Sequence, residues 1–585
     1  MPEDLDKLNI SPEFHSFLNN LSVIAEQEDR IPFIGREKEI EAVMESLLRK
    51  LKNNLLLIGK PGVGKTALIT EIAARINKGQ VPGFLKQKII LELSMNTFLY
   101  SRESTEILFK DFERLFSDIK KNKDKIIFFL DEMQMQSVVG TDRGDEYRQI
   151  QSLLKSYLSK RGLSIIAATT PENYFKYIKN DKLLSLSFSP VFINEPSEKE
   201  MLFILRGVKS YFEKYYSIRI RVDVFDKIYY LAQRFIPHRA FPHKAVDLLD
   251  MACSKSSLKG KDELSENFIY RSVSDISKLR LGIVKLDPDK HYRGIYDYLK
   301  KKVVNQMEAL SEISRIIKLS RLETDINDAR PEGIFLFLGA TGVGKSFIAQ
   351  KVAEYLFGNE KKLRIIDLKY YKKPGDIRKL IGDSRSIPGE LVQEVEDHPF
   401  SVVLFENIAE AHSLVLAFLG KVLSRGYIVD PFGKKHHLSN IIFILNLTRI
   451  GEEKKGRKIG FVRSDKKSKT IVIPSKIMNV LDWVDEIIEF VPLLKDHLKE
   501  IARKKINNLI KEIRKKYNTA VEINDNVFNY IAAKALKDGS FAHSVGRIIE
   551  REIRIRLLDL ISKGDKKKQV EVSMVSQKIN LKVRK

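Results

Sequence analysis

The chain has 585 residues, of which 102 are Lys or Arg and 77 are Asp or Glu, giving a formal net charge of +25 at pH 7. At about 150 residues per folding unit this length corresponds to roughly four units, which excludes a single compact domain. Hydrophobic residues make up 43% and charged residues 31% of the chain, so a disordered or low-complexity protein is also excluded. The positive charge favours acidic partners such as nucleotides, nucleic acid or anionic lipid.

The sequence also indicates a compartment. Its single cysteine, Cys253, cannot form an intramolecular disulfide, which favours a reducing environment. The first residues lack a basic segment followed by an apolar one, and no run of about 18 uncharged apolar residues occurs. We therefore expect a cytoplasmic protein without a signal peptide and without a membrane span.

One pattern, G-x-x-x-x-G-K-[ST], occurs twice, at residues 59–66 and 339–346. Each copy follows an apolar run typical of a buried strand and precedes a helical pattern, at 67–76 and at 347–355. The repeat predicts two strand–loop–helix units.

Further short apolar runs follow each copy, at 126–130 and 163–168 in the first half and at 401–405 and 441–445 in the second. Helical patterns separate these runs, which is typical of a parallel sheet in an α/β fold. Helix-period patterns then dominate 197–280 and 494–563. The sequence predicts tandem α/β modules, each a parallel-sheet P-loop subdomain followed by a helical lid. The predicted divisions are an N-terminal extension (1–30), the first α/β subdomain (31–195), the first lid (196–280), a connector (281–300), the second α/β subdomain (301–493), and a second lid with a basic C-terminal tail (494–585).

The repeated pattern predicts a phosphate site. Its glycines allow backbone N–H groups to cradle phosphate oxygens at a helix N-terminus, while the lysine reaches the β- and γ-phosphates and the hydroxyl holds Mg²⁺. We predict ATP and Mg²⁺ as cofactors of both copies. The predicted binding residues are Gly59, Pro61, Gly62, Val63, Gly64, Lys65, Thr66 and Ala67 in the first copy and Gly339, Thr341, Gly342, Val343, Gly344, Lys345 and Ser346 in the second.

Two carboxylates end the apolar run at 126–130, namely Asp131 and Glu132. In this position Asp131 suits a Mg²⁺ partner beside Thr66, and Glu132 suits a base that polarises water. The alternative is that both acids only cap a strand.

Together these motifs resemble the Clp branch of the AAA+ ATPases, most closely the ClpA and ClpC types, over about residues 30 to 560. Beyond the P-loops, the resemblance rests on short phrases along both halves. They include Ile34-Gly35-Arg36, Ala168-Thr169-Thr170, Glu195-Pro196-Ser197, Pro242-His243-Lys244, Glu410-Ala411-His412 and Asp485-Glu486-Ile487. The resemblance implies a two-tier hexamer that binds ATP between subunits and pulls client polypeptides through a central pore, often into a partner peptidase. It also assigns Thr170 to the sensor 1 position.

The first half departs from this family at three places. Only about 30 residues precede the first module, so we expect the family's amino-terminal domain to be absent. Leu186 and Ser187 stand where relatives have arginines that reach the neighbouring subunit's γ-phosphate, a contact worth about 10³ to 10⁵ in rate in related systems. The aromatic of the first pore loop is also missing, and Phe98 and Tyr100 are the nearest substitutes.

The second half departs further. At the Walker B strand Glu406 could still serve the metal, whereas Asn407 replaces the family's Glu and cannot accept a proton. Trp483 replaces the arginine finger, His543 replaces the sensor 2 arginine and Thr448 replaces the sensor 1 Asn. We therefore predict that the second module binds nucleotide without turning it over.

A tripeptide after the last second-module strand, Ile459, Gly460 and Phe461, is flanked by Lys and Arg residues. It resembles the loop by which ClpA and ClpC dock into hydrophobic pockets of the ClpP peptidase, where an exposed aromatic anchors the contact. The alternative is an ordinary basic surface loop.

Three functional hypotheses remain open. The first is an ATP-driven unfoldase or chaperone subunit in which at most the first module hydrolyses. The second is a nucleotide-binding pseudo-ATPase that completes or regulates rings made with an active Clp ATPase. Whether the rings are homo- or hetero-oligomers is left open. The third is a nucleic-acid remodelling ATPase, which we weigh least because no helix-turn-helix or zinc module accompanies the tandem plan. Whether the chain is an enzyme is left open.

Overall fold

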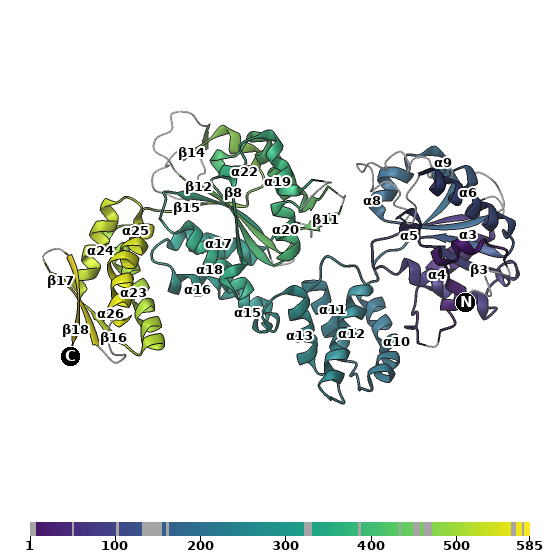
Figure 1. Ribbon diagram of the computed structural model, residues 1–585, viewed down its shortest axis with the longest axis horizontal. Coiled ribbons are helices and arrows are strands. Elements are labelled where there is room, and N and C mark those ends of the chain that lie inside the picture. The colour runs from purple at the N-terminus through teal and green to yellow at the C-terminus, as the bar shows by residue number, and fades with distance from the viewer. Residues whose placement is uncertain are drawn as a thin grey trace. The chain divides into compact units, whose positions relative to one another are not determined.

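The structure is a computed structural model. It describes residues 8–27, 29–49, 52–100, 105–131, 155–158, 163–320, 330–383, 388–431, 434–448, 457–459, 471–562, 569–575 and 578–584. The chain divides into two compact units, Met1–Lys278 and Leu279–Lys585. Each unit contains a mostly parallel sheet and a helical lid, so the predicted tandem α/β fold is confirmed (Figure 1).

The first unit is built on a six-stranded sheet in the order β1-β3-β4-β5-β2-β6. All neighbours are parallel except β1 and β3. The strands are β1 (Leu18–Asn20), β2 (Asn54–Ile58), β3 (Ile89–Leu93), β4 (Ile126–Leu130), β5 (Ser164–Thr169) and β6 (Phe188–Phe192). The strands β2, β4 and β5 are buried along their whole length, as expected for a parallel sheet covered on both faces.

Alternate residues of β2 enter two different cores, one on each face of the sheet. Leu55 and Leu57 pack with α3 (Glu37–Leu48) and α4 (Lys65–Asn77). Leu56 and Ile58 pack with α6 (Thr105–Lys121). The strand's period of two therefore holds the P-loop strand between helices on both sides.

Residues 8–27 belong to this body, which differs from the predicted N-terminal extension. Strand β1 pairs antiparallel with β3, and Phe14 and Phe17 are buried in the core that contains α6. Apolar side chains at an edge strand explain why this segment packs instead of extending into solvent.

The first lid consists of four helices, α10 (Glu198–Tyr216), α11 (Val224–Phe235), α12 (His243–Leu258) and α13 (Glu266–Ser277). Its first helix begins with a capping box, in which the Ser197 hydroxyl accepts the N–H of Glu200 and the Glu200 carboxylate accepts the N–H of Ser197. The family-like phrase 195–197 is therefore the helix start that separates sheet from lid.

The second unit repeats the plan in a five-stranded parallel sheet, in the order β15-β7-β12-β9-β8. This order matches β6-β2-β5-β4-β3 of the first sheet. The strands are β7 (Gly333–Gly339), β8 (Leu363–Asp367), β9 (Ser401–Glu406), β12 (Ile441–Thr448) and β15 (Glu486–Glu489). The helices around it include α16 (Ile295–Lys302), α17 (Met307–Leu319), α18 (Lys345–Phe357), α20 (Glu390–Asp397) and α21 (Ser413–Arg425).

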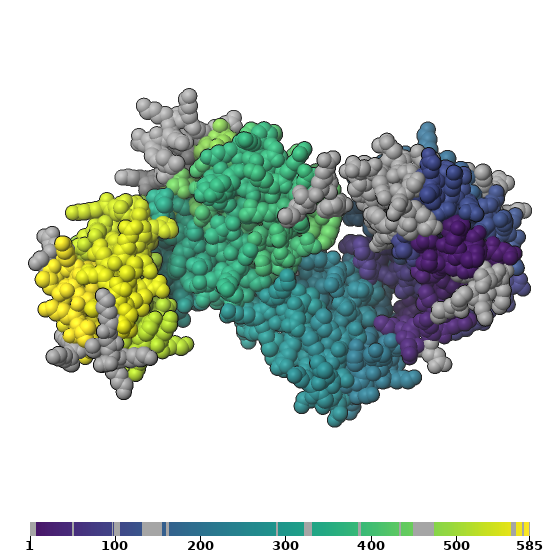
Figure 2. All heavy atoms as spheres, in the orientation of Figure 1, coloured from purple at the N-terminus to yellow at the C-terminus, as the bar shows by residue number. Residues whose placement is uncertain are grey.

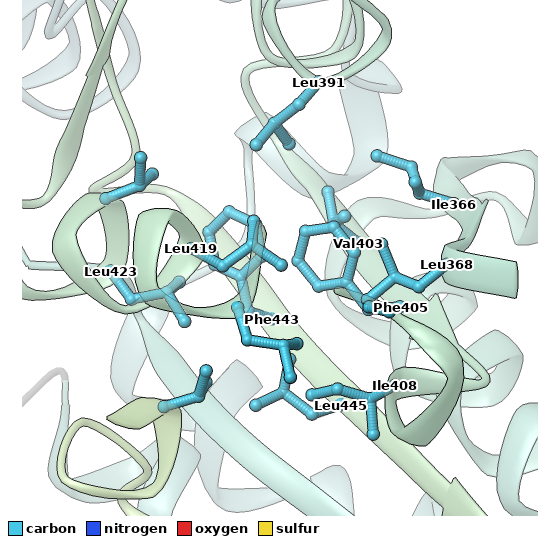
Figure 3. Close-up of a cluster of buried hydrophobic side chains, with 14 of the residues drawn as sticks. Ile366, Leu368, Leu391, Val403, Phe405, Ile408, Leu419, Leu423, Phe443 and Leu445 are labelled. Atoms are coloured by element: carbon cyan, nitrogen blue, oxygen red, sulfur yellow. The ribbon is translucent and has the colours of Figure 1, made fainter. Parts of the chain in front are cut away.

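The core on one face of this sheet is shown in Figure 3, where Val403 and Phe405 of β9 and Phe443 and Leu445 of β12 lie beside Leu419 of α21. Between β8 and β9, the short helix α19 (Ile377–Ile381) precedes α20. Two small hairpins complete the α/β part, β10 (Tyr427–Val429) with β11 (Lys435–His437) and β13 (Arg457–Ile459) with β14 (Ile471–Ile473).

The second lid contains α23 (Lys495–Tyr517), α24 (Asp525–Lys537), α25 (Phe541–Ile548) and α26 (Ile555–Ser562). A three-stranded sheet of β16 (Ala520–Ile523), β17 (Gln569–Val575) and β18 (Lys578–Arg584) adjoins these helices. Residues 569–575 and 578–584 fall in the predicted basic C-terminal tail, yet they belong to the lid, because Val570, Val572 and Ile579 are buried in the lid core. In Figure 2 these last elements, drawn in yellow, form one compact lobe.

None of the helices in the described part of the chain is both long and apolar enough to cross a membrane.

Candidate functional site

The first P-loop lies between β2 and α4, at the carboxyl edge of the sheet. Here the chain leaves β2 and passes over two strands to reach β3, the place where α/β sheets bind ligands. Gly62 (φ +83°) and Gly64 (φ +97°) take left-handed backbone conformations that suit glycine. A Cβ at Gly59 would lie 2.7 Å from the Ile193 carbonyl oxygen, so a side chain has no room there. The loop leaves the N-terminus of α4 open to an anion.

The predicted side chains meet in this loop. The Lys65 ammonium donates to the carbonyl oxygens of Gly59 (2.8 Å) and Lys60 (3.2 Å). The Thr66 hydroxyl donates to Asp131 Oδ2 at 2.6 Å. A hydroxyl and a carboxylate side by side are oxygen ligands of the kind that Mg²⁺ takes together with water and substrate phosphates.

Two threonines follow Asp131 across the sheet edge at the end of β5. Thr170 lines the same cavity, and its hydroxyl accepts the N–H of Asn173 at 3.3 Å, capping the short helix α8 (Pro171–Asn173). The Thr169 hydroxyl is buried and has no hydrogen-bond partner among the described residues, although it also lines the cavity. Such a group fits a polar ligand. The predicted base, Glu132, lies outside the described residues.

The cavity next to the P-loop has a volume of about 670 Å³, a size that holds a nucleotide-sized molecule. Its walls come mainly from four parts of the first unit: the P-loop with the start of α4, the segment before α3, the carboxyl ends of the strands, and the lid helices α10 and α12. Apolar side chains suited to a flat base line it beside the phosphate loop; they are Ile31, Pro32, Phe33, Ile34, Ile204, Val208 and Val246. Of these side chains Ile34 belongs to one of the phrases that carry the family resemblance, and no sequence motif predicts a role for the set.

The lid is tied to the P-loop in two ways. The N–H of His243, at the start of α12, donates to the Gly62 carbonyl oxygen at 3.3 Å. The Glu195 carboxylate accepts the N–H of Phe241 (3.0 Å) and the ammonium of Lys60 (2.9 Å). Burial raises the pKa of Glu195, but these two bonds outweigh it and hold the pKa below its usual value.

The second P-loop has the same geometry. Gly342 (φ +81°) and Gly344 (φ +108°) are left-handed, and the Lys345 ammonium donates to the carbonyl oxygens of Gly339 (2.6 Å) and Ala340 (2.8 Å). Burial lowers the pKa of Lys345 to about 8, although Glu406 opposes the shift. As in the first unit, the N–H of a lid residue, Ala542, donates to the Gly342 carbonyl oxygen at 3.1 Å.

At the predicted metal position the second loop has a hydroxyl beside a carboxylate, as the first loop does, but different residue types supply them. The Ser346 hydroxyl donates to Glu406 Oε1 at 3.0 Å, so Glu406 occupies the place that Asp131 has in the first module. Both oxygens again fit Mg²⁺. The next residue, Asn407, occupies the place of Glu132, and its amide Nδ2 donates to Asp367 Oδ1 at 2.8 Å. The sequence analysis did not single out Asp367.

Of the other replaced positions of the second module, Thr448 and His543 also lie at this edge, whereas Trp483 precedes β15 and lies near the start of β7, at the opposite edge. Thr448 pairs in register with Gly339, one residue beyond the pair of Leu447 and Leu338. His543 lies against the P-loop, 3.5 Å from where a Cβ of Gly342 would be. Trp483 is 40% exposed, and its carbonyl oxygen accepts a bond from Arg330.

The structure corrects one prediction about the pore. Phe98 is fully buried and its ring contacts Phe14, Phe17 and Phe112, so it cannot grip a substrate. Its apolar ring is part of the core of the first unit, which is why it does not reach solvent.

The predicted contact loops differ in how far the structure describes them. Leu186 is 70% exposed on α9 (Lys182–Ser187), and the Ser187 hydroxyl donates to the Leu183 carbonyl oxygen within that helix. The backbone of Ile459 pairs with Ile471 at the end of β13, while Gly460 and Phe461 lie outside the described residues.

Comparisons with known proteins agree with this architecture. Four family models match, and together they follow the order of subdomains along the chain. They are the ATPase family associated with various cellular activities (AAA) at 55–181, the AAA lid domain at 197–291, the AAA domain (Cdc48 subfamily) at 330–481 and the C-terminal, D2-small domain of ClpB protein at 493–574.

Similar proteins cover nearly the whole chain. The ATP-dependent Clp protease ATP-binding subunit ClpC of Staphylococcus epidermidis is 28% identical over 97% of this chain and 78% of its own length. ClpC of Staphylococcus aureus is 28% identical over 96% of this chain and 77% of its own length. Among solved structures, the Saccharomyces cerevisiae Hsp104–ADP complex has a TM-score of 0.73 at 25% identity, covering 96% of this chain and 98% of that one. A closed state of Hsp104 with ATPγS and FITC casein has a TM-score of 0.67 at 25% identity, covering 97% and 99%.

Proposed function

Since this chain belongs to the Clp/Hsp100 family of AAA+ ATPases, we propose that it is an ATP-binding chaperone or unfoldase subunit in which only the first module hydrolyses ATP. Both P-loops would bind Mg²⁺–nucleotide through their lysine and hydroxyl. Bound Mg²⁺ supplies neutralisation of the phosphate charge.

The observation that carries this proposal is the difference between two otherwise equivalent loops. The Thr66–Asp131 pair of the first loop is followed by a carboxylic acid, Glu132, whereas the Ser346–Glu406 pair of the second is followed by an amide. A carboxylate can accept a proton from attacking water, and an amide cannot. Both loops thus have the lysine and hydroxyl that would bind Mg²⁺–nucleotide. Only the first has an acid that could activate water.

The test is to measure steady-state ATP turnover and nucleotide binding of the full chain and of two variants, Lys65→Ala and Lys345→Ala. Lys65→Ala should abolish turnover and leave about half of the bound nucleotide. Lys345→Ala should reduce the bound nucleotide similarly but keep most of the turnover. The opposite pattern, in which turnover depends on Lys345, contradicts the proposal.

We also propose that the subunit assembles into rings, alone or with other Clp ATPases, and acts on protein clients. The solved Hsp104 complexes with casein and the ClpC relatives support this assignment. A ClpP-like peptidase is a proposed partner through Ile459, Gly460 and Phe461.

Changing Phe461 to Ala tests the peptidase contact. Because one exposed aromatic would anchor the loop, the variant should unfold at the same temperature as wild type yet fail to co-purify with a ClpP-type peptidase. Arg463→Ala is the matched control in the same loop and should keep most of the binding. If the Phe461→Ala variant still binds the peptidase, the loop is an ordinary surface loop and not the docking site.

A second candidate function is a pseudo-ATPase that regulates an active Clp ATPase. The apolar, 70% exposed Leu186 favours it, since this side chain cannot neutralise phosphate charge in a neighbouring site. A purified chain that binds ATP at both loops and turns over none would support this candidate over the first.

A further inference from the structure

In the second module, the acid that ends strand β8 accepts a hydrogen bond from the residue that follows the neighbouring strand β9. Asp367, the last residue of β8, pairs in register with Glu406, the last residue of β9. The Asn407 amide donates to Asp367 Oδ1 at 2.8 Å. Asp367 also accepts the N–H of Lys369 at 3.1 Å and forms an ion pair with its ammonium at 2.6 Å.

The contact fixes which way the amide faces. An ionised carboxylate only accepts hydrogen bonds, so the Nδ2 side of Asn407 must face Asp367. Burial raises the pKa of Asp367, but the bonds from Lys369 and Asn407 outweigh it and lower the pKa, which keeps the group ionised at neutral pH. The side-chain oxygen Oδ1 is therefore the part of the Asn407 amide that can accept a hydrogen bond at this edge of the sheet.

The backbone on both sides of the contact is held by the core. Ile366 and Leu368 flank Asp367, while Phe405 and Ile408 flank the segment 406–407, and all four side chains are fully buried. Figure 3 shows these four residues pointing into one cluster. The two polar side chains are thus presented from rigid positions.

The first module has no acid at the corresponding place. Its strand β3 ends at Leu93, which pairs with Leu130, so that Ser94 stands next to Asp131 as Asp367 stands next to Glu406. In the second module a carboxylate on the neighbouring strand thus accompanies the amide at 407. In the first module the sequence has the acid at 132 instead, and the residue that follows β3 is a neutral serine.

We propose that Asp367 is a positioning residue, which holds the Asn407 amide so that only its oxygen is offered to Mg²⁺–nucleotide at the second P-loop. Such an oxygen accepts a hydrogen bond from metal-bound water but takes no proton from it. The second module would then retain Mg²⁺–nucleotide in a fixed geometry without activating water. This inference rests on the proposed function. It adds that Asp367 is the residue through which the second site would hold nucleotide without hydrolysing it.

The first test uses isosteric changes in the full chain: Asn407→Asp, Asp367→Asn and the double variant that exchanges the two residues. Asn407→Asp places two carboxylates in contact and should lower the unfolding midpoint by a few degrees. Adding Asp367→Asn should restore most of the loss, since an amide–carboxylate pair forms again. If the two single effects simply add, the side chains are not coupled and the proposal fails.

The second test measures what a merely structural contact would not change, the Mg²⁺ dependence of nucleotide binding. In a Lys65→Ala background, binding of a fluorescent ADP analogue reports the second module. Asp367→Asn should weaken binding about 3- to 10-fold in Mg²⁺, the loss expected for one misaligned hydrogen bond, and should leave binding in EDTA unchanged. Lys369→Arg is the matched control, because it keeps the positive charge beside Asp367 as well as the Asn407–Asp367 bond, and should not alter either value.

The outcomes separate the two claims. An equal effect of Asp367→Asn with and without Mg²⁺ overturns the positioning role and leaves the proposed function standing. No nucleotide binding in the Lys65→Ala chain, or brisk turnover there, overturns both.

Discussion

We expect nucleotide binding in the first module to depend most directly on Lys65, because its ammonium lies against the carbonyl oxygens of the P-loop, where the phosphates are predicted to bind. In a Lys345→Ala background, Lys65→Ala should weaken ATP binding by about 10- to 100-fold, the value of one or two charge-assisted hydrogen bonds. Isothermal titration calorimetry measures it. Lys78→Ala, at the exposed far end of the same helix, is the control and should bind as wild type. Unchanged affinity in Lys65→Ala would show that the phosphate site lies elsewhere.

For Asn407 we predict that restoring the missing acid does not restore ATP hydrolysis in the second module. Asn407→Glu supplies the missing acid, yet Trp483 and His543 still leave the transition-state charge without a guanidinium, and Asp367 repels the new carboxylate. Steady-state ATPase of the Lys65→Ala chain should therefore stay within about 3-fold of its value before the change. Asn407→Gln controls for side-chain length. A large gain in rate would mean that the roles of Trp483 and His543 have been assigned to the wrong residues.

Residues within a motif could be predicted from the sequence, and residues that meet across strands could not. The contact of Thr66 with Asp131 follows from the loop spacing and from a strand that ends in an acid. The contact of Asn407 with Asp367 depends on strand register between residues 40 positions apart in the chain, which no local pattern encodes. Phe98 was misjudged because proximity to a loop says nothing about which face of a helix is buried.

At the scale of elements, the joint between sheet and lid depends on Glu195. Its carboxylate, 30% exposed, joins a sheet-side lysine to the backbone at the start of a lid helix. Glu195→Gln should lower the free energy of unfolding by about 1 kcal/mol at pH 7, since the bonds persist without the charge and solvent screens part of the loss. Urea unfolding of the variant and of the exposed-surface control Glu41→Gln measures this difference.

The same joint has a defined pH dependence. The pKa of Glu195 is lower in the folded chain than its unfolded value of about 4.3, so its contribution to stability is complete above that value. The contribution is lost as the pH falls through the lowered folded pKa. The difference between wild type and Glu195→Gln should therefore shrink steadily below pH 4. A difference that stays constant down to pH 2 would exclude the carboxylate as its source.

Long buried strands were predicted well, and edge elements were not. The runs at 126–130 and 441–445 lie within β4 and β12 because continuous apolar sequence is required where helices cover both faces. β1 has three residues and β18 alternates polar or basic residues with apolar ones, so neither carries such a run. Both were assigned to an extension or a tail, although their apolar side chains pack on larger cores.

For the whole molecule, the most informative comparison is between ATP turnover by this chain alone and ATP turnover by this chain mixed with another Clp ATPase. If an arginine finger acts across a subunit interface, a ring of this chain presents Leu186 and Ser187 to every first-module site, and hydrolysis should be slow. Adding a Clp ATPase that keeps its arginines should raise the rate above the sum of the separate rates. Measuring ATPase activity of each protein alone and of the mixture provides the test. Fast hydrolysis by the purified chain contradicts this prediction and points to another cation, Lys182 being the nearest in sequence.

The bond from each lid to its P-loop, from the N–H of His243 to Gly62 and from the N–H of Ala542 to Gly342, is made by main-chain atoms alone. Amino-acid replacement other than proline cannot delete such a bond, because it alters side chains and leaves the peptide group in place. The main-chain bond between P-loop and lid therefore does not depend on the catalytic side chains and can remain when they are replaced. If the second module binds nucleotide without hydrolysing it, as we propose, its lid would still be linked to its P-loop, so nucleotide binding and release could be passed on to the lid.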